Sequence, residues 1–396
     1  MDSYNAELII KEDGVVVVKK QLANINVLPA RDSVIDISSY FPRLKTSAEY
    51  HVELHFTLKE DLPWAQEGFD IASNQLLLKN AVHSRKQLTQ TGKVNINETV
   101  NDITVKGKDF VAKIQKNTGA LISYLYKGKQ EIIQPLTPNF KRPMTDNDRR
   151  GWKPNKKLKE WYDYELKPGG TTISNSSEGE PVIKTLYTLI NDSASVSIDY
   201  TFRKNGMIAI DYDLNVKPGL PNIPKIGLQM GIDSSYKEIE YFGRGPYENY
   251  IDRRYGSDAG IYKQDIYHFM EPYVVPQENG NRTDVRWMYL SNPKTKNGFL
   301  VVADSLLSMS AWPYTQENIE KAHHTIDLKE AGYITLNIDL VQMGVGGNDS
   351  WSDVAAPLPQ YQVEAKHYHY SFCLFPFNKK NDKPEELEKT ITKLYE

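Results

Sequence analysis

The stretches VSIDYTF (196–202) and IAIDYDLNV (208–216) decide the fold class, because apolar and polar residues alternate along both of them. Successive side chains of a β-strand point to opposite faces, so a period of two describes a strand with one face against a core and the other in water. The same alternation occurs in YHVELHFTL (50–58) and YITLNIDL (333–340). In FVAKIQKNTGALISYLYKGKQEII (110–133), two glycines mark tight turns between strands. These stretches predict an all-β protein.

Helical periodicity is clearest at the end of the chain. KPEELEKTITKLYE (383–396) combines an early proline and several acids with apolar residues at helical spacing, so we expect a short C-terminal helical tail at 381–396. Strands do not alternate with amphipathic helices of about 10–15 residues. This pattern argues against a parallel α/β barrel and against a dinucleotide-binding fold in this chain.

The composition is that of a folded globular protein, with 396 residues, 40% hydrophobic residues and a net charge of -3. This length suggests two or three domains. The basic residues do not cluster as they do in nucleic-acid-binding proteins, and no run of about 20 apolar residues could span a bilayer. We therefore expect neither a nucleic acid nor a membrane as a partner. Cys373 is the only cysteine, and its setting in YSFCLFPF indicates a buried thiol.

A domain boundary is predicted near residues 80–101. The sequence KNAVHSRKQLTQTGKVNINETVN (79–101) is polar and contains few large apolar residues. About eighty residues of strand pattern precede it, which is the size of a small β-sandwich. Nearly continuous strand-and-turn sequence follows it, which suggests an extended double sheet. We therefore expect domains at 1–80 and 102–380 with a linker at 81–101.

Two motifs resemble metal sites, but structural roles are favoured for both. TDNDRRGWKPNKK (145–157) begins like a calcium loop, yet basic residues stand at the fifth and twelfth positions, where oxygen ligands are required. A turn stabilised by Asp146 and Asp148 is the better interpretation. His367 and His369 share one face of a predicted strand, but no third zinc ligand accompanies them. We predict no metal site in this chain.

Two carboxylates are candidates for sugar chemistry. Glu248 lies in GRGPYENY and Glu278 in PQENGNR. Glycoside hydrolysis requires a pair of carboxylates at a defined separation, which a sequence alone cannot supply. Arginines lie close to both residues in the sequence. The favoured interpretation is that each acid pairs with an arginine and orders a loop.

A tryptophan in a loop is the remaining candidate. In GVGGNDSWSDV (344–354), Trp351 follows Asn348, Asp349 and Ser350, which are residues typical of loops. An indole can cover the apolar C–H face of a sugar while neighbouring polar groups bind its hydroxyls. From composition alone, however, a ring folded back onto the core is favoured over a sugar platform.

Several long motifs, in a fixed order, resemble the large β-galactosidases of glycoside hydrolase family 2. Three of them resemble that family's C-terminal β domain, namely YFGRGPYENYIDRR (241–254), YVVPQENGNRTDVRWMYLSN (273–292) and QMGVGGNDSWS (342–352). PMTDNDRRGW (143–152) is similar to a segment near the start of that domain. DLPWAQEGFDIASNQLLL (61–78) resembles the end of the preceding sandwich domain. The resemblance covers nearly the whole chain.

The resemblance implies an architecture and a division of labour. It implies an immunoglobulin-like β-sandwich at 1–80, truncated at its start, and a galactose-mutarotase-like β-supersandwich at 102–380. In that family the catalytic glutamates and the magnesium and sodium ligands lie in or next to a (β/α)8 barrel that precedes these domains. We therefore expect no catalytic residue and no cofactor in this chain. We interpret it as a C-terminal, non-catalytic portion of a retaining β-galactosidase acting on lactose-like substrates, with a naturally separate small subunit as a less favoured alternative.

The resemblance also implies the site residues and the partners. Trp351 matches a tryptophan that stacks on the leaving-group sugar, with Asp349 and Ser350 beside it. Arg149, Arg150, Gly151 and Trp152 resemble a loop at the mouth of the active site. The implied partners are a galactoside, the missing catalytic barrel and further copies of the intact enzyme, in a bacterial cytoplasm or periplasm.

Other functions stay open at this stage. A free-standing carbohydrate-binding module would bind galactosides tightly through Trp351, whereas half of a divided site should bind only weakly. A mutarotase-like enzyme would need a general acid and a general base facing a sugar ring, and only fold analogy supports it. A purely structural module that forms oligomers is the remaining possibility.

Overall fold

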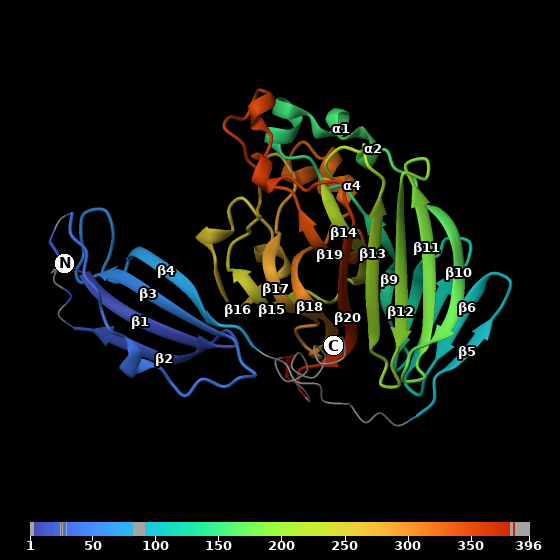
Figure 1. The fold of residues 1–396 in the computed structure, drawn as a ribbon, viewed down its shortest axis with the longest axis horizontal. Helices are drawn as coiled ribbons and strands as arrows, with labels where there is room; N and C mark the ends of the chain where they lie inside the picture. Colours follow the sequence, from blue (N-terminus) through green and yellow to red (C-terminus); the bar gives the residue numbers. More distant parts are fainter. Residues whose placement is uncertain are drawn as a thin grey trace. The chain divides into compact units, whose positions relative to one another are not determined.

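The computed structural model describes residues 4–23, 25, 27–28, 30–81, 92–380 and 383–384. The chain forms two compact units, mainly Met1–Lys86 and mainly Gln87–Ser257 with Tyr262–Tyr395 (Figure 1). Strands dominate both units, so the prediction of an all-β protein is confirmed. The predicted helical tail at 381–396 lies outside the described residues except for Lys383 and Pro384, and so does most of the first half of the predicted linker at 81–101.

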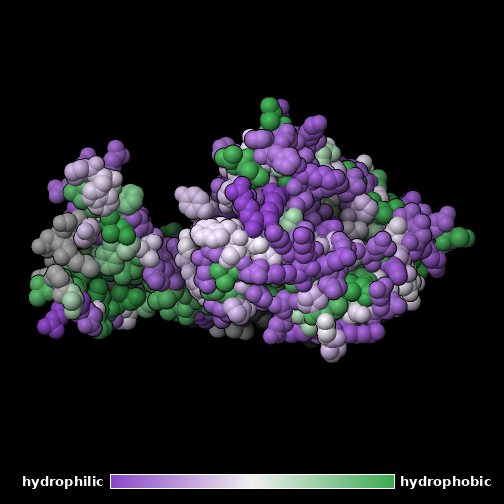
Figure 2. Space-filling model, turned by 90° about the horizontal axis from the view of Figure 1, so that it is seen from above, coloured by the Kyte–Doolittle hydropathy of each residue, from purple (hydrophilic) through white to green (hydrophobic). Residues whose placement is uncertain are grey.

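The first unit is built on one antiparallel sheet with the strand order β2-β1-β3-β4. The strands are β1 (Tyr4–Glu12), β2 (Val15–Leu22), β3 (Tyr50–Leu58) and β4 (Asp70–Lys79). Alternate residues of β1, namely Ala6, Leu8 and Ile10, are buried. By contrast, β2 and β4 expose apolar side chains, among them Val16 and Leu76. Figure 2 shows apolar residues gathered on the surface of this unit.

The second unit contains a large curled sheet. Its main path has the strand order β10-β11-β12-β13-β20-β18-β19-β14-β9-β8-β7-β6-β5, and β15, β16 and β17 branch from β18. The strands are β5 (Asn95–Glu98), β6 (Asp102–Lys106), β7 (Phe110–Gln115), β8 (Leu121–Tyr126), β9 (Lys129–Asn139), β10 (Lys167–Asn175), β11 (Pro181–Leu189), β12 (Ala194–Phe202), β13 (Ile208–Val216), β14 (Lys225–Asp233), β15 (Glu238–Gly245), β16 (Asp258–Asp265), β17 (Arg282–Ser291), β18 (Asn297–Trp312), β19 (Tyr333–Gln342) and β20 (Tyr368–Asn378).

The helices are short and lie in the connections between strands. They are η1 (Ser38–Tyr40), η2 (Asn147–Trp152), α1 (Pro154–Lys157), α2 (Lys159–Tyr162), η3 (Arg254–Gly256), α3 (Ile266–Phe269), α4 (Gln316–Lys321), η4 (Thr325–Asp327), η5 (Asp353–Ala355) and η6 (Pro359–Tyr361). Among the described residues, no helix has the length and the apolar character needed to cross a bilayer.

The alternation in 196–202 and 208–216 correctly predicts which side chains are buried. In β12, Val196, Ile198 and Tyr200 are fully buried, whereas the polar residues between them are partly exposed. Hairpin turns also occur where glycines predict them, since β7, β8 and β9 pair in succession. Lys127 and Gly128 both adopt positive φ angles, 48° and 80°, as a two-residue type I′ turn requires. Cys373 is buried, as expected.

The prediction that one face of the strand at 333–340 is exposed to solvent is wrong. In β19, Thr335, Asn337 and Asp339 are buried as deeply as the apolar residues between them. The reason is a polar cluster inside the unit. The Nζ atom of Lys225 lies 3.4 Å from the Asp339 carboxylate and donates to Asn337 Oδ1 at 3.0 Å. Gln229 donates to the same oxygen at 2.8 Å. Buried polar groups are tolerated where they bind one another in this way.

Candidate functional site

The loop that carries Trp351 packs against the turn that contains residues 149–152. The Asn147 amide donates to the carbonyl oxygen of Asp349 at 3.4 Å, and Lys157 pairs with Asp353 at 2.7 Å. The contact leaves no room for a side chain at Gly151, where a Cβ atom would lie 2.3 Å from the Cβ of Ala355. The structure therefore brings the two groups of predicted site residues together.

Trp351 stands in solvent on a loop that is closed by its own hydrogen bonds. The side chain is 76% exposed. One carboxylate oxygen of Asp349 accepts the backbone N–H groups of Trp351 (3.2 Å) and Ser352 (3.0 Å), and the other accepts the Ser352 hydroxyl (2.6 Å). Mainly because of the Ser352 hydroxyl, the pKa of Asp349 is lowered. Asp349 thus shapes the loop, and Ser350 is exposed beside the indole.

The side chains of residues 149–152 take different positions. Arg149 donates to the carbonyl oxygens of Pro276 (3.1 Å) and Glu320 (3.0 Å), which fixes the turn. Trp152 is buried, so its ring supports the turn from inside. The Arg150 side chain is 73% exposed. Of these four residues, Arg150 offers the side chain that a ligand could reach.

A buried ion pair connects the turn to the start of the Trp351 loop. The carboxylate of Asp148 accepts hydrogen bonds from the Thr145 backbone N–H (3.0 Å) and the Trp152 indole N–H (2.9 Å). Arg142 lies 3.5 Å from this carboxylate, and both side chains are 1% exposed. Arg142 also donates to the carbonyl oxygens of Met343 (2.6 Å) and Gly344 (2.8 Å).

These contacts confirm that Asp148 stabilises a turn. Its carboxylate oxygens already serve Thr145, Trp152 and Arg142, so they do not form a calcium loop. Within the described ranges, no group of three or more His, Cys, Asp or Glu side chains is arranged to hold a metal ion. His367 and His369 instead pair with Asp213 (2.7 Å) and Asp211 (3.0 Å) across β20 and β13.

Sequence reasoning missed the residue that anchors the glycines before Trp351. One oxygen of Asp252 accepts the backbone N–H groups of Val345 (2.8 Å) and Gly346 (2.9 Å). A Cβ atom at Gly344 would lie 2.6 Å from the same oxygen. Asp252 belongs to the motif at 241–254, but nothing in that motif alone indicates its partner in the chain.

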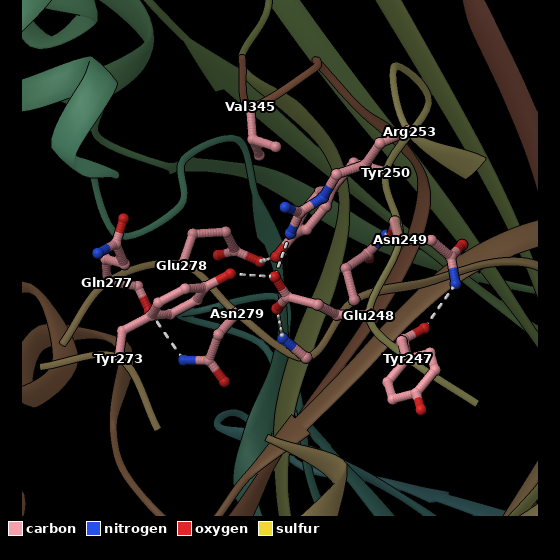
Figure 3. A network of polar contacts seen from close by, with 12 residues as sticks. Tyr247, Glu248, Asn249, Tyr250, Arg253, Tyr273, Gln277, Glu278, Asn279 and Val345 are labelled. Atoms are coloured by element: carbon pink, nitrogen blue, oxygen red, sulfur yellow. Dashed lines mark hydrogen bonds and ion pairs between the residues drawn. The ribbon is translucent and has the colours of Figure 1, made fainter. Parts of the chain in front are cut away.

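A cavity of about 460 Å³ lies between these motifs. The lining residues are Thr145, Asn147, Tyr250, Asp252, Arg253, Tyr273, Gln277, Glu278, Val345, Gly346, Gly347, Leu358 and Tyr361. Figure 3 shows its polar network from close by. The 143–152, 241–254, 273–292 and 342–352 motifs all contribute to this lining, although they are far apart in the sequence.

Glu248 orders this network. It accepts hydrogen bonds from the Arg253 guanidinium and the Tyr273 hydroxyl, and from the Gly280 backbone N–H at 2.7 Å (Figure 3). The prediction that Glu248 pairs with a nearby arginine is confirmed. Both carboxylate oxygens of Glu248 are therefore occupied by hydrogen bonds within the chain.

The prediction of an arginine partner is wrong for Glu278. Its Oε1 atom instead accepts hydrogen bonds from the Tyr250 hydroxyl (3.5 Å) and the Gln342 amide (3.3 Å), and no described residue binds its Oε2 atom. Burial raises the pKa of Glu278 to about 7, against the opposing charges of Lys225 and Arg142. Charge desolvation thus dominates at this position.

The raised pKa of Glu278 predicts a specific pH dependence of stability. The folded chain binds this proton more tightly than the unfolded chain, where the pKa is near 4.5. The free energy of unfolding should therefore fall as pH rises from about 4.5 to about 7. Glu278→Gln should remove up to about 3 kcal/mol of that fall, measured by urea unfolding at several pH values. A variant that keeps the full pH dependence would show that folding does not raise the pKa of Glu278.

Comparison with known proteins connects this architecture to a family. The family described as "Beta galactosidase small chain" matches residues 106–374, and "Beta-galactosidase, domain 4" matches residues 1–79. Among solved structures, the galactose mutarotase related enzyme from Lactobacillus acidophilus aligns over 72% of this chain and 98% of its own, with 9% identity and a TM-score of 0.36.

Several curated relatives of this chain are named beta-galactosidase. A beta-galactosidase of Priestia megaterium is 30% identical over 381 residues, which cover 95% of this chain and 36% of that protein. A beta-galactosidase of Lactobacillus delbrueckii subsp. bulgaricus is 32% identical over 320 residues, which cover 79% of this chain and 30% of that protein. The chain thus spans about a third of the length of these relatives. Because the first family match covers more than half of the chain, this protein belongs to the beta-galactosidase small chain family.

Proposed function

We propose that this chain forms the C-terminal, non-catalytic portion of a retaining β-galactosidase and supplies Trp351 as a platform for the leaving-group sugar. The observation that carries this proposal is the 76% exposed indole on a loop fixed by hydrogen bonds. A galactoside would lie with its apolar face on the ring, while the residues that break the bond would come from a barrel outside this chain.

The geometry of the loop supports a binding role for the indole. Leaving a large ring in water forgoes about 1.5–3 kcal/mol of burial free energy. Covering its face with the C–H groups of a sugar would recover part of this amount. The Asp349 turn and the Asp252 anchor fix the backbone on both sides of the ring before a ligand arrives. Such preorganisation lowers the entropy lost on binding.

The carboxylates near the loops support placing catalysis elsewhere. Glu248 is held by three donors, and Glu278 is buried beneath Tyr250 and Gln342. Glycoside hydrolysis requires two carboxylates that both reach the glycosidic bond, and the oxygens of Glu248 are already occupied within the chain. The magnesium and sodium ions implied by the resemblance would likewise bind to the barrel, and contacts among copies would form in the intact enzyme.

Replacing Trp351 tests this proposal directly. Lactose should change the tryptophan fluorescence of the chain saturably but weakly, because half of a divided site binds without its second wall. Trp351→Ala should abolish this change. Trp64→Ala is the matched control, since Trp64 is also exposed, at 63%, but lies in the first unit. A response that survives Trp351→Ala and is lost in Trp64→Ala would contradict the proposal.

Experiments on the same purified chain distinguish the alternative functions. Tight binding of lactose would favour a free-standing carbohydrate-binding module. Faster mutarotation of fresh α-galactose, followed by polarimetry, would favour a mutarotase-like enzyme. We expect neither result, and we expect no release of nitrophenol from a nitrophenyl β-galactoside. Measurable hydrolysis by this chain would place the catalytic carboxylates within it.

A further inference from the structure

A second cavity in the larger unit, of about 610 Å³, does not involve the Trp351 loop. It is lined by Thr137, Pro138, Asn139, Lys141, Arg142, Pro143, Met144, Tyr162, Tyr164, Gln229, Thr315, Gln316, Glu317, Glu320 and Tyr333. These residues come from β9, α2, β14, α4, β19 and the connections next to them. Its volume falls in the range typical of small-molecule sites.

Three amide side chains in the cavity wall hold one another in fixed orientations. The Oε1 atom of Gln316 accepts hydrogen bonds from the Asn139 amide (2.8 Å) and the Gln229 amide (3.1 Å). The Gln229 amide also donates to buried Asn337 at 2.8 Å, and Asn337 in turn donates to Ser310 at 3.0 Å. Two polar groups of the lining residues remain available, because no described residue binds the Gln316 Nε2 atom or the Gln229 Oε1 atom.

Tyrosines contribute to the apolar surface of the cavity. Tyr164 is fixed by its hydroxyl, which donates to the Pro138 carbonyl oxygen at 3.2 Å, and by an edge-on contact with Phe140. Tyr162 and Tyr333 also line the cavity. The Tyr162 hydroxyl has no hydrogen-bond partner among the described residues. The lining thus combines tyrosine side chains with polar groups that have no partner among the described residues.

The charges around the cavity compensate one another. Glu317 pairs with Lys321, and Glu320 lies 3.7 Å from Arg149 and accepts the Met144 backbone N–H at 2.6 Å. Lys141 donates to the Tyr162 carbonyl oxygen at 3.1 Å. The lining contains two basic side chains, Lys141 and Arg142, and two acidic ones, Glu317 and Glu320, so it has no excess of one charge that would select an anion or a cation.

We propose that this cavity binds a neutral carbohydrate of mono- or disaccharide size. Aromatic faces match the C–H surface of a sugar ring, and the fixed amides match its hydroxyls, which both donate and accept hydrogen bonds. The proposal does not depend on Trp351. A chain of this kind would hold a sugar at a position separate from the indole platform.

Ligand-observed NMR on the full chain tests the proposal with lactose, maltose and methyl β-D-galactoside. At least one sugar should show saturable binding that persists in Trp351→Ala. Gln316→Leu should weaken that binding about tenfold, as expected when a sugar hydroxyl loses a fixed polar partner. Gln66→Leu, on an exposed loop of the first unit, is the matched control and should change nothing.

A second variant controls for the possibility that Gln316→Leu misfolds. Tyr162→Phe removes one unpartnered hydroxyl and leaves the ring, so it should keep the thermal stability and weaken binding about fivefold. The proposal is overturned if none of the three sugars binds in the presence of Trp351→Ala. It is also overturned if binding is unaffected by both cavity variants.

Discussion

Arg142→Met is expected to lower the free energy of unfolding by about 3–5 kcal/mol, the usual effect of breaking a buried ion pair. The substitution removes the charge that lies 3.5 Å from buried Asp148, together with the donors to the Met343 and Gly344 carbonyl oxygens. Methionine keeps an unbranched side chain but is shorter and offers no donor, so these acceptors would stay buried without a partner. Urea unfolding monitored by fluorescence measures the loss.

Arg150→Met is the matched control for this variant. The Arg150 side chain is 73% exposed and lies 4.0 Å from the nearest oxygen of Asp146. Exposed ion pairs contribute little, so the control should change the free energy of unfolding by less than about 0.5 kcal/mol. A similar, small effect of both substitutions would show that Arg142 does not join the turn to the loop.

The sequence predicts the fold class well because the alternation of apolar residues directly reports which face of a strand is buried. β12 follows its pattern residue by residue. β19 does not, because Asn337 and Asp339 face a polar cluster formed with Lys225 of β14. The partner strand decides whether a polar residue lies in water or in such a cluster, and local alternation carries no information about that partner.

The candidate site, too, could be predicted from the sequence only in part. Motif order and resemblance identified Trp351 and residues 149–152, and the family itself is confirmed. They did not identify Asp252 and Arg142, which bind backbone groups of residues 343–346 at the start of the Trp351 loop. Every residue carries the backbone atoms that these side chains bind. The sequence therefore contains no residue type that would reveal where the partner lies. The stacking role of Trp351 stays a prediction.

A glycine decides whether the turn and the Trp351 loop can meet. Gly151→Ala would place a Cβ atom 2.3 Å from the Cβ of Ala355 and 3.0 Å from the Ser352 carbonyl oxygen. Ala355 is fully buried, so its methyl group cannot swing aside. We expect the two segments to separate, with a loss of about 1–3 kcal/mol in the free energy of unfolding, as overpacking usually produces. The fluorescence response to lactose should fall with it, because Trp351 would leave its fixed position.

Two further variants make this result specific. Gly346→Ala lies in the same loop, but its Cβ atom would be 3.8 Å from its nearest neighbour, so stability and the lactose response should both be kept. The double variant Gly151→Ala with Ala355→Gly removes the atom at 2.3 Å and should recover most of both losses. Such a recovery would be a coupling energy between residues in contact. If Ala355→Gly adds to the damage instead, the loss does not arise from the contact between the two segments.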